Sequence, residues 1–187
     1  MSEHGALENL TVLDLTRVLA GPFCTMMLAD MGANVIKIEI PNGGDDTRAY
    51  PPFREHNLQG ERESLYFANL NRNKKGVTLN LKTPEGKELF KKMVSRADVV
   101  VENYRPGVMD KLGLGYDVLK EINPRIIYAA VSGFGCYGPY HLRPGYDILA
   151  QAMGGMMAIT GPKGGGPTRA GSALGDILGG LHVTIGI

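Results

Sequence analysis

The amino-acid sequence predicts an α/β fold, a doubly wound parallel sheet with helices on both faces. Short runs rich in Val, Leu and Ile alternate along the chain with segments that repeat apolar residues at helical spacing. Several of the helical segments begin with Pro or Thr, which favour the first turn of a helix. A parallel sheet accommodates this alternation most simply, because each crossover helix covers one face of the sheet. We therefore expect a Rossmann-like domain.

In the first half of the chain, strand-like runs and helix signals define the elements. The apolar run 10–15 is typical of a buried strand, and Gly21-Pro22 begins a helix that Gly32 ends. In 34–40, apolar residues alternate with Lys37 and Glu39, as in a second strand. Segment 41–63 has no periodicity, so we expect a functional or disordered loop. The predicted strands here are 10–15, 34–40 and 77–81, and the helices are 21–31 and 66–73.

The second half contains the clearest helix start of the sequence. Thr83-Pro84-Glu85 combines a capping hydroxyl, a proline at the first position and an acid in the first turn. We expect Leu13, Ile36, Val100 and Ile127 on the central strands. The predicted strands are 98–104 and 125–132; the helices are 84–96, 108–112, 116–122, 147–157 and one that starts near Asp176.

Composition excludes several classes of partner. A chain of 187 residues can form one domain with a full core. Its formal net charge of +1 predicts no attraction to nucleic acid or to an anionic membrane, and no apolar run is long enough to cross a bilayer. Cys24 and Cys136 are far apart and have no ligand-spaced partners. This usage predicts a reducing, cytoplasmic location and no metal site.

The stretch from Gly161 to His182 contains the most distinctive candidate for chemistry, Asp176. A carboxylate near a helix start and beside glycine is accessible to a bulky substrate and can act as a covalent nucleophile. Asp is also a favoured helix N-cap, and on local sequence alone that is the simpler interpretation. We interpret the adjacent Gly164–Gly166 run as a mobile lid.

A second glycine pattern, Gly133 to Gly138, matches G-x-G-x-x-G after a predicted strand. A dinucleotide site requires a helix directly after this motif, and Pro139 and Pro144 break that segment. We therefore exclude a nicotinamide or flavin site at this motif.

Basic residues cluster on the connections between predicted strands. In a parallel sheet, ligands bind at the carboxyl ends of the strands. Lys82, Arg105 and Lys111 follow strand ends, and we expect them to face one cleft that holds a phosphorylated ligand. Ordinary solvated side chains are the alternative. The basic residues of these connections are Lys74, Lys75, Lys82, Arg105 and Lys111.

Six segments together resemble family III CoA-transferases. They cover nearly the whole chain, in the order and spacing of that family. The segments are Asp14 to Phe23, Gly32 to Glu39, Gly44 to Arg48, Asn71 to Lys75, Val101 to Gly107 and Gly145 to Gly155.

The resemblance implies an enzyme that moves CoA from an acyl-CoA donor to a carboxylic acid, a class that includes dicarboxylic acids. Asp176 would attack the thioester, and an aspartyl anhydride and an aspartyl-CoA thioester would follow. Full-length members are interlocked homodimers with a second domain, which is absent from this chain. The residues that the resemblance assigns to CoA contact are Val18, Leu19, Ala20, Lys74, Leu79, Lys82, Asn103, Tyr104, Arg105, Lys111, Gly145, Tyr146 and Asp147.

Two alternatives stay open at this point. The related α-methylacyl-CoA racemases have a catalytic histidine where this sequence has Tyr146, which argues against proton abstraction here. A truncated, inactive CoA-binding or assembly module is the other alternative. The apolar segment 181–187 has no helix-ending signal. We therefore interpret 1–187 as one CoA-binding domain, incomplete at its C-terminal end, and expect this fragment alone to be inactive.

Overall fold

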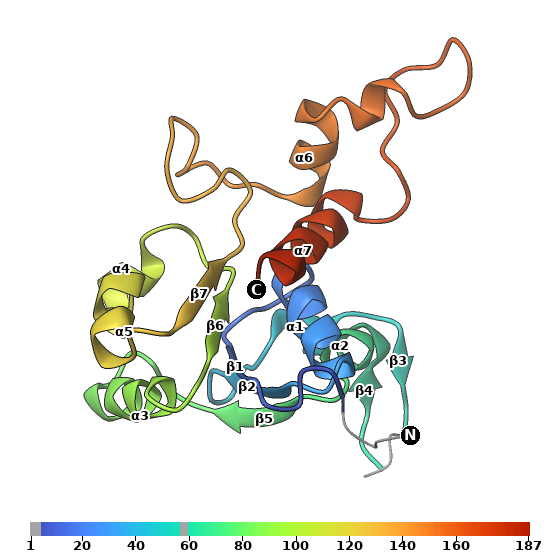
Figure 1. The fold of residues 1–187 in the computed structure, drawn as a ribbon. Coiled ribbons are helices and arrows are strands. Elements are labelled where there is room, and N and C mark those ends of the chain that lie inside the picture. Colours follow the sequence, from blue (N-terminus) through green and yellow to red (C-terminus); the bar gives the residue numbers. More distant parts are fainter. Residues whose placement is uncertain (1–4, 57–59) are drawn as a thin grey trace.

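A computed structural model, which describes residues 5–56 and 60–187, contains a five-stranded sheet in the order β5-β2-β1-β6-β7 (Figure 1). All four strand pairs are parallel. The predicted doubly wound parallel sheet is therefore confirmed. Its strands are β1 (Thr11–Asp14), β2 (Asn34–Glu39), β5 (Lys75–Thr78), β6 (Val99–Glu102) and β7 (Ile127–Ala130).

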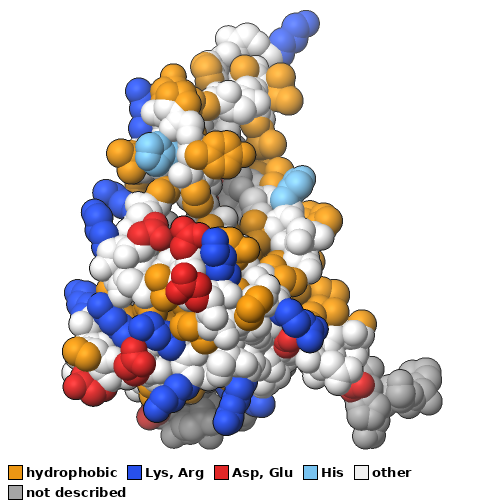
Figure 2. Space-filling view, turned by 60° about the vertical axis from the view of Figure 1, so that its left-hand side comes forward, with side chains coloured by type: hydrophobic (Ala, Val, Ile, Leu, Met, Phe, Trp, Pro, Cys, Tyr) orange, Lys and Arg blue, Asp and Glu red, His pale blue; other side chains and the backbone are white. Residues whose placement is uncertain are grey.

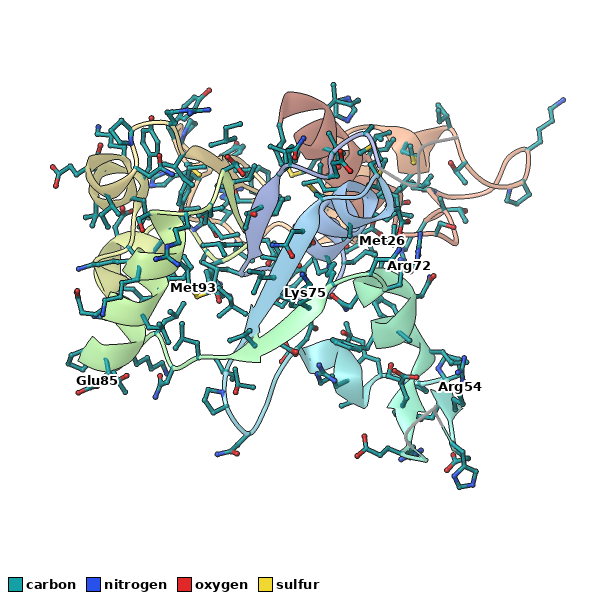
Figure 3. The ribbon with its side chains drawn as sticks, turned by 60° about the horizontal axis from the view of Figure 1, so that its bottom comes forward. Met26, Arg54, Arg72, Lys75, Glu85 and Met93 are labelled. Carbon is teal, nitrogen blue, oxygen red and sulfur yellow. The ribbon has the colours of Figure 1, made fainter. Side chains whose placement is uncertain are left out.

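Helices cover both faces of this sheet. Figure 1 shows α1 and α7 on one face and α3, α4 and α5 on the other. Met26 of α1 and Met93 of α3 accordingly lie on opposite sides of the strands, with Lys75 on the edge strand (Figure 3). The helices are α1 (Ala20–Asp30), α2 (Leu65–Asn71), α3 (Pro84–Val94), α4 (Val108–Leu112), α5 (Tyr116–Ile122), α6 (Asp147–Met153) and α7 (Leu174–Gly186).

Strand alternation divides the apolar side chains between two cores. In β1, Val12 packs with Cys24 and Leu28 beneath α1, whereas Leu13 packs with Phe90 beneath α3. Successive side chains of a strand point to opposite faces, so a strand buried on both sides needs an uninterrupted apolar run. Val99, Val100 and Val101 of β6, all fully buried, satisfy the same requirement.

The structure corrects three details of the sequence interpretation. The strand predicted at 77–81 is β5, which spans Lys75–Thr78. Leu79 and Leu81 therefore lie beyond its end, and they are buried in the core beneath α3. Ile127 is on the edge strand β7, where its side chain is 40% exposed, and not on a central strand. Segment 41–63 contains a short helix, η1 (Asp46–Ala49), and a two-stranded sheet of β3 (Phe53–Arg54) and β4 (Glu63–Ser64); its residues 57–59 lie outside the described part.

The helix start predicted at Thr83 is confirmed. Thr83 is the N-cap of α3, and its hydroxyl oxygen accepts a hydrogen bond from the backbone N–H of Gly86 at 3.1 Å. Pro84 occupies the first turn, where a missing N–H removes no helical hydrogen bond.

After β7 the chain makes a long excursion before α7 returns to the sheet. The excursion contains α6 and η2 (Met156–Ala158) and projects from the rest of the domain (Figure 1). Many of its apolar side chains are exposed, and they gather in the upper part of the surface in Figure 2. Among the described residues, no helix is long and apolar enough to cross a membrane.

Candidate active site

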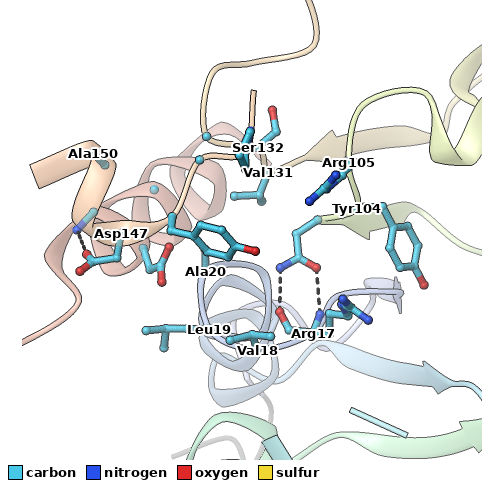
Figure 4. Close-up of a pocket in the computed structure, with 18 of the residues that line it drawn as sticks. Arg17, Val18, Leu19, Ala20, Tyr104, Arg105, Val131, Ser132, Asp147 and Ala150 are labelled. Atoms are coloured by element: carbon cyan, nitrogen blue, oxygen red, sulfur yellow. Dashed lines mark hydrogen bonds between the residues drawn. The ribbon is translucent and has the colours of Figure 1, made fainter. Parts of the chain in front are cut away.

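A cleft of about 580 Å³ opens at the carboxyl ends of β1 and β6. From this point the chain runs outward in both directions, from β1 to β2 on one side and from β6 to β7 on the other. Such a reversal leaves a crevice between two adjacent strand ends, which is where ligands bind in open α/β sheets. Figure 4 shows Arg17, Val18 and Leu19 on one side of the cleft, Tyr104 and Arg105 on a second, and Asp147 on a third.

Asp176 lines this cleft from the first turn of α7. Its side chain is half-buried, and in the described part of the chain no hydrogen bond or ion pair engages its carboxylate. Burial raises the pKa of Asp176, the charge of Asp147 raises it further, and Arg169 partly opposes this. A desolvated, unpaired carboxylate is more basic, which favours nucleophilic attack.

The capping interpretation of Asp176 is wrong. The N-cap of α7 is Ala173, which makes no side-chain capping bond, and Asp176 lies three residues further on. The capping carboxylate comes from another helix: Asp147 Oδ1, in α6, accepts a hydrogen bond from the N–H of Gly175 at 2.8 Å.

Asp147 lines the cleft, but its oxygen atoms are occupied. Its Oδ2 accepts from Gln151 at 2.9 Å and from the Arg169 guanidinium at 3.2 Å. Burial opposes its ionisation, but the bonds from Gln151, Gly175 and Arg169 hold the pKa of Asp147 below its ordinary value. Asp147 therefore joins α6 to α7, and its carboxylate is not free to bind a ligand.

The cationic lining differs from the one predicted. Of the three cations expected to face one cleft, Arg105 lines it, whereas Lys82 and Lys111 are exposed elsewhere. β5, which precedes Lys82, lies two strands from β1, and Lys111 is on the last turn of α4. Arg17 and Arg143 line the cleft instead. Arg17 lies just beyond the end of β1, after Leu15 and Thr16, so the strand-end criterion that identified Arg105 could also have found it.

Two other predicted contact residues are placed in the interior. The side chain of Lys74 is only 1% exposed, and its ammonium lies 3.0 Å from Asp14 Oδ2. It also donates to the carbonyl oxygen of Pro22 at 3.1 Å. Leu79 is buried in the core under α3. Both residues belong to the packed interior and do not line the cleft.

The other residues of the predicted site lie at one cleft, and their contact with CoA stays a prediction. The residues Val18, Leu19, Ala20, Asn103, Tyr104, Arg105, Gly145, Tyr146, Asp147 and Asp176 all line the cleft. The run Gly164–Gly166, interpreted as a lid, is exposed and does not line it. Tyr66, in α2, does not line the cleft. Burial raises the pKa of Tyr66, and the negative charge of Asp176 raises it further.

Residues 7–187 match the sequence model of the family described as CoA-transferase family III. An acyl-CoA transferase of Fusarium pseudograminearum is 52% identical over 97% of this chain and 41% of its own length. The succinyl-CoA:glutarate CoA-transferase of Mus musculus is 50% identical over 94% of this chain and 39% of its own length.

The fold agrees with that of a solved structure. A CAIB/BAIF family protein from Brucella suis superimposes with a TM-score of 0.93 at 45% identity, over 98% of this chain and 48% of that protein. The chain thus spans less than half the length of each of these three relatives.

Proposed function

Because this chain belongs to CoA-transferase family III, we propose that the protein transfers CoA from an acyl-CoA donor to a carboxylic acid acceptor. The observation that supports this most strongly is the unpaired, half-buried carboxylate of Asp176 in the cleft at the ends of β1 and β6. Four of the relatives are named as transferases that use succinate, glutarate, oxalate or mesaconate, and a small dicarboxylic acid is the acceptor class we favour.

The lining of the cleft fits the chemistry of an acyl-CoA. Three guanidinium groups, those of Arg17, Arg105 and Arg143, can pair with phosphate oxygens. Apolar side chains such as Val108 and Val131 provide contact for the uncharged part of the molecule. A concave site with apolar walls and a few converging charged groups is the usual form of a small-molecule site.

In the proposed reaction, a carboxylate oxygen of Asp176 attacks the thioester carbonyl carbon. The carbon–sulfur bond breaks and its electron pair leaves on the sulfur, so the products are an acyl-aspartyl anhydride and the CoA thiolate. The thiolate then attacks the aspartyl carbonyl, which releases the donor acid and forms an aspartyl-CoA thioester. The acceptor carboxylate attacks the carbonyl carbon of this thioester, which expels the CoA thiolate and forms an anhydride between the acceptor and Asp176. The thiolate then attacks the acceptor's carbonyl carbon of the anhydride, so that the acceptor leaves as its CoA thioester and the Asp176 carboxylate is released.

The test uses the full-length protein. We expect Asp176→Asn to reduce transfer by roughly 10³-fold or more, because the amide is not a nucleophile. Hydroxylamine added during turnover should leave a hydroxamate mass tag on the peptide that contains Asp176. Asp117→Asn, at an exposed carboxylate of α5, is the matched control and should behave as the wild type. An active Asp176→Asn protein without a tagged peptide would refute the proposal.

Two further properties stay predictions. The resemblance implies an interlocked homodimer for the full-length protein, and the cysteine usage implies a cytoplasmic location. Sedimentation of the full-length protein and fractionation of cells that express it would test them.

A further inference from the structure

Residues Thr16 to Val18 form the turn that leads from β1 into the cleft. Side chains make hydrogen bonds to nearly every backbone N–H and carbonyl group of this turn. The N–H of Thr16 donates to Asp14 at 2.9 Å, and its carbonyl oxygen accepts from Lys37 at 2.8 Å. The N–H of Val18 donates to Asp45 at 3.2 Å. These partners come from β1, β2 and the segment between β2 and η1. The turn is therefore fixed by the tertiary structure and not by its own local preference.

Arg17, at the middle of the turn, is held from the other wall of the cleft. Its N–H donates to Asn103 Oδ1 at 2.9 Å, and its carbonyl oxygen accepts from Asn103 Nδ2 at 2.7 Å (Figure 4). Asn103 directly follows β6, so this pair of bonds joins the two strand ends between which the cleft opens. Both polar atoms of the Asn103 side chain are used in this way.

The turn needs these hydrogen bonds because the backbone of Val18 is strained. Its φ of +68° lies in the left-handed region, where a β-branched residue is strained. A residue in this conformation persists only when its surroundings over-determine it. The strained turn directs the chain so that Val18, Leu19 and Ala20 line the cleft and α1 begins.

We propose that Asn103 is a positioning residue, which holds the strained turn in its ligand-binding form and does not contact the ligand through its amide. The inference rests on the proposed function, because the ligand in question is CoA or its thioester. Asn103 and Arg105 would therefore have different roles, because the guanidinium of Arg105 is free to pair with a phosphate. The buried ion pair of Lys37 and Asp45, 3.0 Å apart, supports the same turn from below.

A double-mutant cycle on the full-length protein tests the proposal. Asn103→Ala removes both bonds to Arg17, and we expect the Kd for CoA to rise about tenfold to a hundredfold. Glycine adopts a positive φ without strain. We therefore expect the loss of affinity caused by Asn103→Ala to be several times smaller in a Val18→Gly background than in the wild type, whatever Val18→Gly does to the Kd by itself. Asn69→Ala, at an exposed residue of α2, is the control.

Kinetics and hydrogen exchange supply independent readouts. We expect Asn103→Ala to raise the KM for acyl-CoA while kcat stays within about threefold, because saturating substrate restores the turn. Amide exchange at Arg17 and Val18 should accelerate, with the exchange of β1 and β6 unchanged.

The proposal would be overturned if the losses of CoA affinity in the two single mutants simply added in the double mutant. It would also be overturned if Asn103→Ala bound CoA with wild-type affinity. The exchange measurement needs no ligand, so a protein that failed to bind CoA would refute the proposed function while the restraint by Asn103 could still be observed.

Discussion

Asp147 Oδ1 accepts a hydrogen bond from the N–H of Gly175 at 2.8 Å, and so caps α7 at the residue directly before Asp176. Gly175 allows this approach, because a Cβ at its position would lie 2.8 Å from the Cβ of Ala150. The charge that caps the helix also raises the pKa of Asp176. One carboxylate thus positions the candidate nucleophile and makes it more basic.

This relationship predicts a shift in the pH dependence of transfer. Asp147→Asn keeps an acceptor for Gly175 but removes the negative charge, so the pKa of Asp176 should fall toward its ordinary value. The acid limb of the kcat/KM profile should therefore move to lower pH in the full-length protein. Asp117→Asn should leave the profile unchanged. An acid limb that stays in place in Asp147→Asn would show that Asp147 does not act on the nucleophile.

Asp176 should lower the stability of the fold at neutral pH. Its folded-state pKa is above the ordinary value of 3.8, so the folded state binds the proton more tightly than the unfolded state does. The associated stability is present at low pH and is lost as the pH rises from about 3.8 through the raised pKa. We expect Asp176→Asn to increase the free energy of unfolding at pH 7 by about 1 kcal/mol, as often happens when an active-site charge is removed.

Urea unfolding of both proteins at pH 3 and pH 7 checks this expectation. The gain should be present at pH 7 and nearly absent at pH 3, where the carboxyl group of Asp176 is protonated in both states. A variant that is less stable than the wild type at pH 7 would contradict it.

Arg105 and Lys82 should differ in their effect on CoA binding. Arg105 lines the cleft, and we expect Arg105→Ala to raise the Kd for CoA roughly tenfold, the cost of one charge-assisted hydrogen bond of about 1.5 kcal/mol. Lys82 is exposed outside the cleft, and Lys82→Ala should change the Kd by less than about twofold. Calorimetry at low and physiological salt measures both. An equal loss in the two variants would mean that the ligand extends along the sheet edge beyond the cleft.

The contact between α1 and α7 should depend on one of two adjacent glycines. A Cβ on Gly180 would lie 2.4 Å from the carbonyl oxygen of Ala20, whereas a Cβ on Gly179 would meet open space. We expect Gly180→Ala to lower the free energy of unfolding by about 1–3 kcal/mol, because backbone must move apart. Gly179→Ala should stabilise the helix by about 0.5–1 kcal/mol. Thermal unfolding compares them, and equal effects would show that the helices do not meet at Gly180.

The sequence by itself determined the order and type of the helices α1 to α7 and of the strands of the five-stranded sheet, but not the short elements η1, β3 and β4. Apolar runs such as Val99–Val101 and the Thr83-Pro84 helix start depend on residues that are close along the chain, so local patterns suffice to identify them. Because strands and helices alternate along the chain, a parallel sheet is the simplest topology. The order of the sequence motifs identifies the family.

Only the tertiary structure decided which side chains serve the cleft and which serve the fold. Asp147 and Gly175 are 28 residues apart, Asn103 and Arg17 are 86 apart, and Lys74 reaches the carbonyl of Pro22 across 52 residues. Hydrogen bonds and ion pairs between such distant residues leave no local pattern, and burial sets the pKa of Asp176 through atoms from several elements. A charged residue in a connection between strands therefore looks the same in the sequence whether it binds a ligand, as we propose for Arg105, or holds the interior together, as Lys74 does.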